Sequence, residues 1–182
     1  EVLTVNPASN SIYDAAGNAA STTQSNNTQT LNDQASPTMT IASSTVSSGS
    51  TTNDASIALT FTSNEATTNF VAGDISVTNG TISYFSSGSS TVYTATFTPT
   101  ANGACTIDVA AATFTDGASN PNTAATQFTW TFDSTSPTMT ITAAEGTDPF
   151  TSNDATISLT FTASQATTNF VAGDISVTNG TI

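Results

Sequence analysis

The sequence predicts an all-β protein made of tandem β-sandwich domains of about 100 residues each. Three observations lead to this prediction. Apolar residues alternate with Ser and Thr in many short runs, which is the period of a half-buried strand. Turn signals such as SGSS, ANG and DGASN separate these runs. The stretch TTNFVAGDISVTNGTI occurs at residues 67–82 and, letter for letter, at residues 167–182.

The repeat divides the chain into one complete unit and two partial ones. SPTMTI at residues 36–41 returns at 136–141, and DAAGN at 14–18 is similar to DGASN at 116–120. The predicted units are residues 1–35, the C-terminal part of a preceding repeat; 36–135, a complete repeat; and 136–182, the N-terminal part of a following repeat.

Each expected strand of the complete repeat has one apolar face. In SIALTFT, for example, Ile57, Leu59 and Phe61 alternate with Ala, Ser and Thr, and TVYTATFT, ACTIDVA and QFTWTFD follow the same pattern. Thr suits the outward positions because its branched side chain fits a pleated strand while its hydroxyl faces water. The expected strands cover residues 36–42, 56–62, 74–78, 81–86, 91–98, 104–110 and 127–133.

About seven short strands in one repeat indicate a two-sheet sandwich of immunoglobulin type. Asn79-Gly80 lies between two of the expected strands and predicts a two-residue hairpin turn. Cys105 is the only cysteine, so the sandwich must do without an internal disulfide. We expect Cys105 to be a buried thiol, with an intermolecular disulfide as the alternative. Trp130 continues the inward face of its run and is expected in the core.

The composition excludes several classes of function. The chain has no Lys, Arg or His against 13 acidic residues, a formal net charge of −13. The chain therefore has no cationic side chain with which to attract nucleic acid or anionic lipid electrostatically. The usual general bases and cationic catalytic groups are absent, and the acids are scattered among turns, so we expect no enzyme. No apolar run approaches a membrane span and no signal peptide is visible, so an export signal or anchor is expected outside this sequence.

Several spaced motifs carry a resemblance to a known family. EATTNFVAGDISVTNGTIS, VYTATFTPTANG, FTDGASN and WTFDSTSPT closely resemble the bacterial Ig-like tandem repeats of large extracellular surface proteins and adhesins. The resemblance implies an extracellular, cell-surface location and a structural role as a rigid spacer or filament subunit. Its partners would be neighbouring identical repeats or chains, head to tail, with glycans as further partners. The alternative is a ligand- or glycan-binding Ig-like adhesion module, stiffened by calcium.

Calcium is the one cofactor that the sequence suggests, because similar adhesins often bind it at domain junctions. Calcium takes six to eight oxygen ligands, usually from several carboxylates. Asp133 lies at the junction before Ser136-Pro137, and Asp116 lies in a loop that could reach it, so these two residues are the predicted ligands. The alternative is that both acids only form turns, as Asp and Asn often do.

Two kinds of surface feature complete the set of candidate sites. Asn26, Asn79 and Asn179 stand in N-x-S/T sequons and are candidate glycosylation sites. Flat rows of outward Thr also occur on ice-binding surfaces, but ordinary alternation of apolar and polar residues accounts for them here.

Residues 1–35 and 136–182 together contain most of one repeat. We therefore expect each end to be completed by, or to continue into, an identical neighbour.

Overall fold

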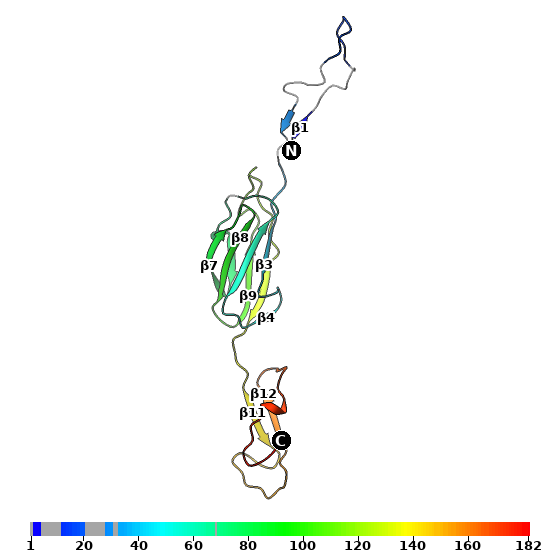
Figure 1. Ribbon diagram of the computed structural model, residues 1–182. Helices are drawn as coiled ribbons and strands as arrows, with labels where there is room; N and C mark the ends of the chain where they lie inside the picture. The colour runs from blue at the N-terminus through cyan, green and yellow to red at the C-terminus, as the bar shows by residue number, and fades with distance from the viewer. Residues whose placement is uncertain (1, 5–11, 21–27, 31–32, 68) are drawn as a thin grey trace. The chain divides into compact units, whose positions relative to one another are not determined.

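The computed structural model describes residues 2–4, 12–20, 28–30, 33–67 and 69–182, and its central part is a two-sheet sandwich (Figure 1). The first sheet has the order β3-β5-β8-β7 and is antiparallel throughout. The second has the order β4-β10-β9-β6, in which β4 runs parallel to β10. The strand bounds are β3 Met39–Ser43, β4 Thr51–Thr52, β5 Ile57–Ser63, β6 Ile75–Thr78, β7 Gly80–Ser87, β8 Val92–Pro99, β9 Gly103–Val109 and β10 Phe128–Phe132.

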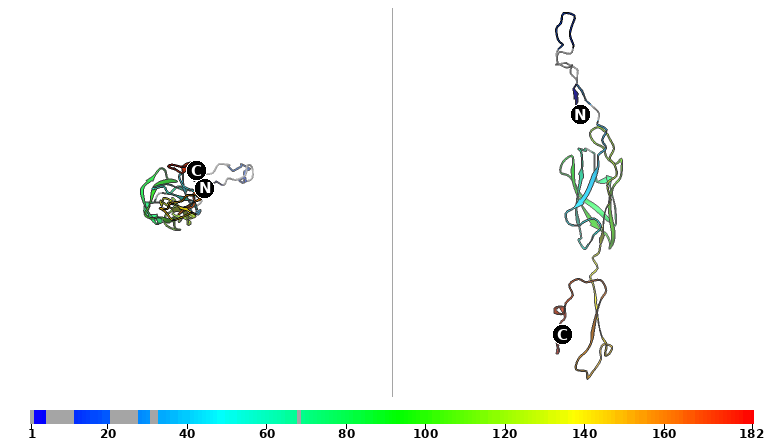
Figure 2. Two further views of the ribbon diagram at one scale, coloured as in Figure 1. Left: turned by 90° about the horizontal axis from the view of Figure 1, so that it is seen from below. Right: turned by 90° about the vertical axis from the view of Figure 1, so that its right-hand side faces the viewer.

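This arrangement confirms the predicted immunoglobulin-type sandwich. Two four-stranded sheets face each other, and the last two strands of the domain, β9 and β10, are neighbours in the second sheet. Figure 2 shows the same strands from two further directions. The inward positions of β5 and β8 are buried and the outward ones are exposed or half-buried, as the alternation predicted. The short strand β4 was not predicted, because two threonines carry no alternation.

The predicted hairpin at Asn79-Gly80 is wrong. β6 pairs with β9, whereas β7 pairs with β8 in the other sheet, so the chain changes sheets at this dipeptide instead of turning back along its own strand. Asn79 takes a left-handed conformation with φ 55°. Its carbonyl accepts a hydrogen bond from the N–H of Thr100. The dipeptide does change the direction of the chain, but the partner of the following strand is decided by packing across the sandwich.

A β-bulge in β7 reverses the side-chain alternation in the middle of that strand. The pairing with β8 shifts register between Ser83 and Ser86. Within the bulge, Tyr84 has φ 50° and is 86% exposed, while Phe85 turns inward and stacks on Tyr93 with a centroid distance of 5.9 Å. The bulge therefore places one aromatic ring in solvent and the next against the core.

The core of the sandwich is a single cluster of buried apolar side chains between the two sheets. Cys105 has 0% exposure and Trp130 2%, so both predicted core positions are confirmed. The Trp130 ring contacts the Phe97 ring edge-on at 4.7 Å between centroids. Since the chain has no disulfide to restrict its unfolded state, this apolar burial carries the stability of the sandwich.

The flanking segments repeat parts of the sandwich. The chain divides after Asp133 into two compact units. In the second, β11 (Met139–Ala143) pairs with β12 (Leu159–Ala163) in the register of β3 with β5. The 3₁₀ turn η2 (Ala172–Asp174) corresponds to η1 (Ala72–Asp74). Before the sandwich, β1 (Val2–Thr4) pairs with β2 (Thr28–Thr30).

Candidate functional site

The loop DGASN after β9 is organised by the carboxylate of Asp116. Its Oδ1 accepts the backbone N–H groups of Ala118 at 2.9 Å and Asn120 at 2.8 Å, and its Oδ2 accepts the Asn120 side-chain amide at 2.8 Å. Asp116 is only 5% exposed. The bond from the Asn120 side chain, with the backbone bonds, holds the pKa of Asp116 below its ordinary value.

The same loop forms independently in the preceding repeat. Asp14 accepts the N–H groups of Ala16 and Asn18 at 2.9 Å and the Asn18 side-chain amide at 2.9 Å. The Asn18 side chain is the main reason that the pKa of Asp14 is lowered. Because Asp14 is exposed and Asp116 is buried, the loop geometry depends on the D-x-x-x-N spacing and not on burial.

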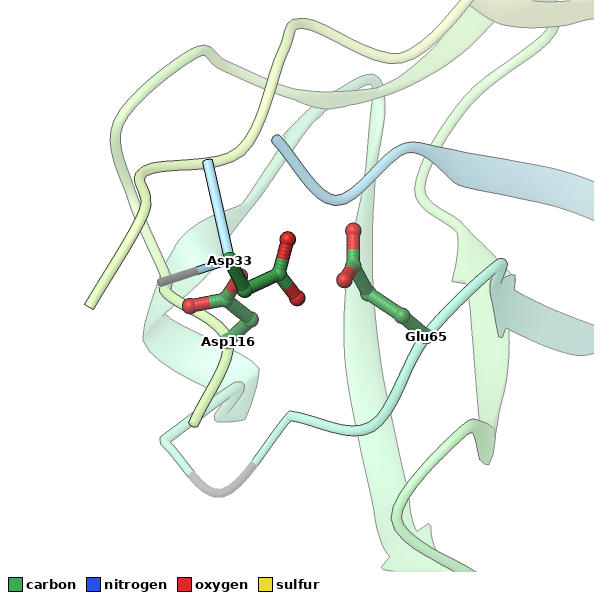
Figure 3. A group of neighbouring side chains, drawn as sticks. All are labelled: Asp33, Glu65 and Asp116. Carbon is green, nitrogen blue, oxygen red and sulfur yellow. The ribbon is translucent and has the colours of Figure 1, made fainter. Parts of the chain in front are cut away.

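Asp116 also belongs to a group of three carboxylates. Asp33 lies before β3 and Glu65 follows β5, and each offers an oxygen within 4.8 Å of the others and of Asp116. Figure 3 shows the three side chains pointing toward one another from three separate segments. The Asn120 amide also donates to the backbone carbonyl of Asp33 at 3.0 Å, which ties the incoming chain to this loop. We call Asp33, Glu65 and Asp116 the acid cluster.

Glu65 is the member of the acid cluster whose charge is least compensated. Its Oε1 is buried and has no hydrogen-bond partner among the described residues. Burial raises the pKa of Glu65, and the charges of Asp33 and Asp116 raise it further. Two species can relieve this repulsion: a proton on Glu65, or a hard cation that accepts several carboxylate oxygens.

Of the two predicted calcium ligands, the structure places Asp116 in the acid cluster and Asp133 elsewhere. Asp133 follows β10, where its Oδ1 accepts the Asn102 amide at 3.2 Å and its N–H donates to the Thr52 carbonyl at 3.0 Å. The residue beside Asp116 is instead Asp33, which occupies the position of Asp133 in the preceding repeat. Asp33 therefore lies with the loops of the sandwich that follows it, whereas Asp133 bonds to the sandwich that precedes it.

Sequence reasoning missed Asp33 and Glu65 as members of this group. Asp33 was recognisable as a repeat of Asp133, but only the topology shows that the start of β3 and the loops after β5 and β9 lie together. Position 65 is Gln165 in the following repeat. This position therefore carries a carboxylate in one repeat and a neutral amide in the other.

The remaining repeated acids have local roles in turns. Asp54 accepts the Thr52 hydroxyl at 2.8 Å, and Asp74 accepts the Val71 N–H at 2.8 Å. In the second unit, Asp174 accepts the Val171 N–H at 3.0 Å in the same way. These contacts match the turn chemistry that the sequence offered as the alternative to metal binding.

The structure describes two of the three candidate glycosylation sites, Asn79 and Asn179. Asn26 lies outside the described residues. The Asn79 amide donates to the Ala101 carbonyl at 2.8 Å, and its Oδ1 accepts the Thr100 hydroxyl at 3.2 Å. Asn179 is exposed and has φ 58°, the same backbone conformation as Asn79. In the folded sandwich, a glycan on Asn79 would therefore compete with the hydrogen bonds that hold the chain where it passes from β6 in one sheet to β7 in the other.

Comparison with known proteins adds one match. Residues 33–132 match the family model described as the bacterial Ig-like domain. No curated protein and no solved structure matches the chain. Within the described part of the chain, none of the helical segments has the length and apolar character needed to cross a bilayer.

Proposed function

Because the chain belongs to the bacterial Ig-like domain family, we propose that it is a structural segment of an extracellular fibre, stalk or adhesin. Domains of this family are often surface-exposed and are generally non-enzymatic. In the proposed role, each sandwich is a rigid spacer and carries no catalytic step. The observation that carries the proposal is the recurrence of the same local structure in successive repeats.

That recurrence is visible at the level of individual bonds. The Asp14 loop repeats the hydrogen bonds of the Asp116 loop, and β11–β12 repeats the register of β3–β5. A chain built from repeated copies of one domain becomes longer without requiring a new binding site in each copy. This suits a spacer better than a module with one specialised site.

The sandwich also has a geometry suited to load along the chain. Near its start, Gly49 donates to the Thr129 carbonyl at 2.7 Å, and the Ser50 carbonyl accepts from Thr131 at 2.9 Å. Since β4 is parallel to β10, pulling the two ends of the sandwich apart loads these bonds in shear. Bonds loaded in shear must break together, so they resist force better than bonds opened one at a time.

Force spectroscopy on the whole chain tests the spacer role. We expect one discrete unfolding step for the sandwich. Roughly 95 residues at about 3.6 Å each extend to about 34 nm, and the gain in contour length is this value less the folded length of the sandwich, or about 30 nm. Residues 134–182 should extend at lower force, because they lack a closed core. Gradual extension of the sandwich at low force, with no discrete step, would contradict the proposal.

The proposed partners are neighbouring identical repeats, either along one polypeptide or in adjacent chains arranged head to tail. In residues 134–182 the inner face is open: Met139, Ile141 and Leu159 are 39%, 55% and 44% exposed. Their counterparts in the sandwich, Met39, Ile41 and Leu59, are 4%, 8% and 1% exposed. Strands of the same repeat type are the natural cover for this face.

The acid cluster supports calcium binding as a second part of the proposed spacer function. In that role, a calcium ion bound by Asp33, Glu65 and Asp116 would link the incoming chain to two loops of the sandwich and stiffen the junction. Three carboxylates supply only part of the six to eight ligands that calcium takes, so water or backbone carbonyls would supply the rest. The metal titration described in the Discussion tests this element separately from the spacer role.

A further inference from the structure

The outer face of the β3-β5-β8-β7 sheet carries rows of threonine hydroxyls. Thr40 lies opposite Thr62, and Thr60 lies opposite Thr94, across neighbouring strands. We define the hydroxyl face by its outward-facing threonines on these strands: Thr40, Thr60, Thr62, Thr81, Thr94, Thr96 and Thr98. All of them are exposed or half-buried.

The hydroxyl face has no charged residue, although the chain has a net charge of −13 and no cationic side chain. Among the described residues of 33–133, every carboxylate lies outside the strands except that of Asp108. Asp108 stands on β9, in the other sheet, where it accepts the Gln127 amide. Two copies of this chain have no cation with which to offset their acids, so any close contact must avoid carboxylates on both sides.

We propose that the hydroxyl face is a surface for lateral association with a second copy of this chain. The threonine methyl groups of two faces would pack together while their hydroxyls exchange hydrogen bonds. Such a contact is self-complementary, as a two-fold interface requires. It goes beyond the spacer role, because it joins chains side by side and not end to end, and it does not depend on that role.

The second unit presents the same face. Thr140 lies opposite Thr162, and Thr142 lies opposite Thr160. Two outward positions differ between the repeats: Ala42 is replaced by Thr142 and Ala58 by Ser158. Both differences keep the face uncharged and add a hydroxyl, whereas the difference at Glu65 and Gln165 changes a charge.

The size of the face indicates a weak contact for each repeat. Four strands about 4.8 Å apart, over about five residues at about 3.3 Å, give a patch of roughly 300 Å² in projection. A standard stable interface buries about 800 Å² per partner. One repeat should therefore associate only at high concentration, and contacts from successive repeats should add through effective concentration.

Salt provides a signature of this association. Repulsion between two chains of charge −13 opposes the contact, and no attractive ion pair exists to be weakened. Raising NaCl from about 0.1 M to about 1 M shortens the screening length from about 10 Å to about 3 Å. Association through the hydroxyl face should therefore become stronger with salt.

Sedimentation of the whole 182-residue chain over a concentration series, at both salt levels, tests the proposal. The test variant is Thr94→Asp, which places a carboxylate at an exposed position on the inner strand β8. The matched control is Thr131→Asp, which does the same on the inner strand β10 of the other sheet. Thermal unfolding checks that both variants keep the fold. Concentration-dependent NMR shifts of the wild-type chain locate the contact.

We expect the wild-type chain to self-associate more strongly at high salt, with shifts on the outward residues of β5 and β8. Thr94→Asp should weaken the association by roughly tenfold or more, because the new charges face each other across the contact. Thr131→Asp should leave it nearly unchanged. The proposal is overturned if the wild type stays monomeric at both salt levels or if the two variants weaken association equally. It is also overturned if the shifts lie on the open inner face around Ile141 and Leu159.

Discussion

A Cβ atom added to Gly80 would lie 2.1 Å from Cζ of Phe97, with two further ring carbons at 2.5 Å and 2.7 Å. Phe97 is 0% exposed, and its ring packs against Trp130. The ring therefore has no free space to enter. At this point, where the chain changes sheets, glycine is required by packing against the core.

We expect Gly80→Ala to lower the free energy of unfolding by about 2 kcal/mol, in the range of over-packed cores. Urea unfolding measures this, with the fluorescence of Trp130, the only tryptophan, as a probe of the sandwich. Gly73→Ala is the control, because nothing lies within 4 Å of a Cβ added there. If both variants unfold at the same urea concentration, the Phe97 ring adapts and the packing argument fails.

The strands were predictable because burial follows alternation directly. Ile57, Leu59 and Phe61 are all buried, as their spacing required. The partner of a strand was less predictable, since Asn79-Gly80 fits a hairpin as well as a change of sheet. The bulge at Tyr84 was not visible either, because TISYFS reads as a simple strand until Phe85 is seen to pack on Tyr93.

The candidate site was predictable only in part. The sequence singled out Asp116 because its loop recurs, and the structure gives that loop a defined set of hydrogen bonds. It paired Asp116 with Asp133, whereas the junction acid that lies beside Asp116 in this sandwich is Asp33. Nearness in sequence to Asp133 says nothing of which end of the fold each residue occupies. Glu65 gave no signal, since its repeat is Gln165 and the change appeared conservative.

Glu65→Gln should stabilise the sandwich at neutral pH when divalent cations are removed. A group whose pKa is raised by folding contributes stability that is present below its unfolded pKa and is lost as pH rises through the folded value. For Glu65 this loss begins near its ordinary pKa of 4.5 and continues upward. The variant keeps the neutral form at every pH, so its advantage over the wild type should grow from pH 4 to pH 7.

Urea unfolding at several pH values, in the presence of a chelator, measures that difference. Asp54→Asn serves as the control, because Asp54 bonds to Thr52 away from the acid cluster. An advantage of Glu65→Gln that is the same at pH 4 and pH 7 would show that charge repulsion in the cluster is not its cause.

Calcium should raise the melting temperature of the wild-type chain more than that of Glu65→Gln or Asp33→Asn. A ligand at 100 times its Kd stabilises a folded protein by about 2.7 kcal/mol. Both variants remove one charged ligand from the acid cluster, so they should lower calcium affinity. Thermal unfolding with calcium chloride, against NaCl of equal ionic strength, separates binding from general screening of the net charge.

Asp54→Asn should respond to calcium as the wild type does, since it removes a charge from a turn outside the cluster. If calcium and NaCl shift the wild type equally, or if all variants respond alike, the acid cluster is not a calcium site. A spacer role would be unaffected by that result.

Cys105 should resist alkylation in the native chain and react at once in urea. Its side chain is 0% exposed, and burial raises the pKa of the thiol, which lowers the fraction of reactive thiolate. Labelling must therefore wait for the sandwich to open, and its rate at low reagent reports the population of the open form. Gly80→Ala, with its loss of about 2 kcal/mol, should speed labelling by roughly 30-fold, and Gly73→Ala should not speed it. Native labelling as fast as that of the unfolded chain would mean that the sheets separate without global unfolding.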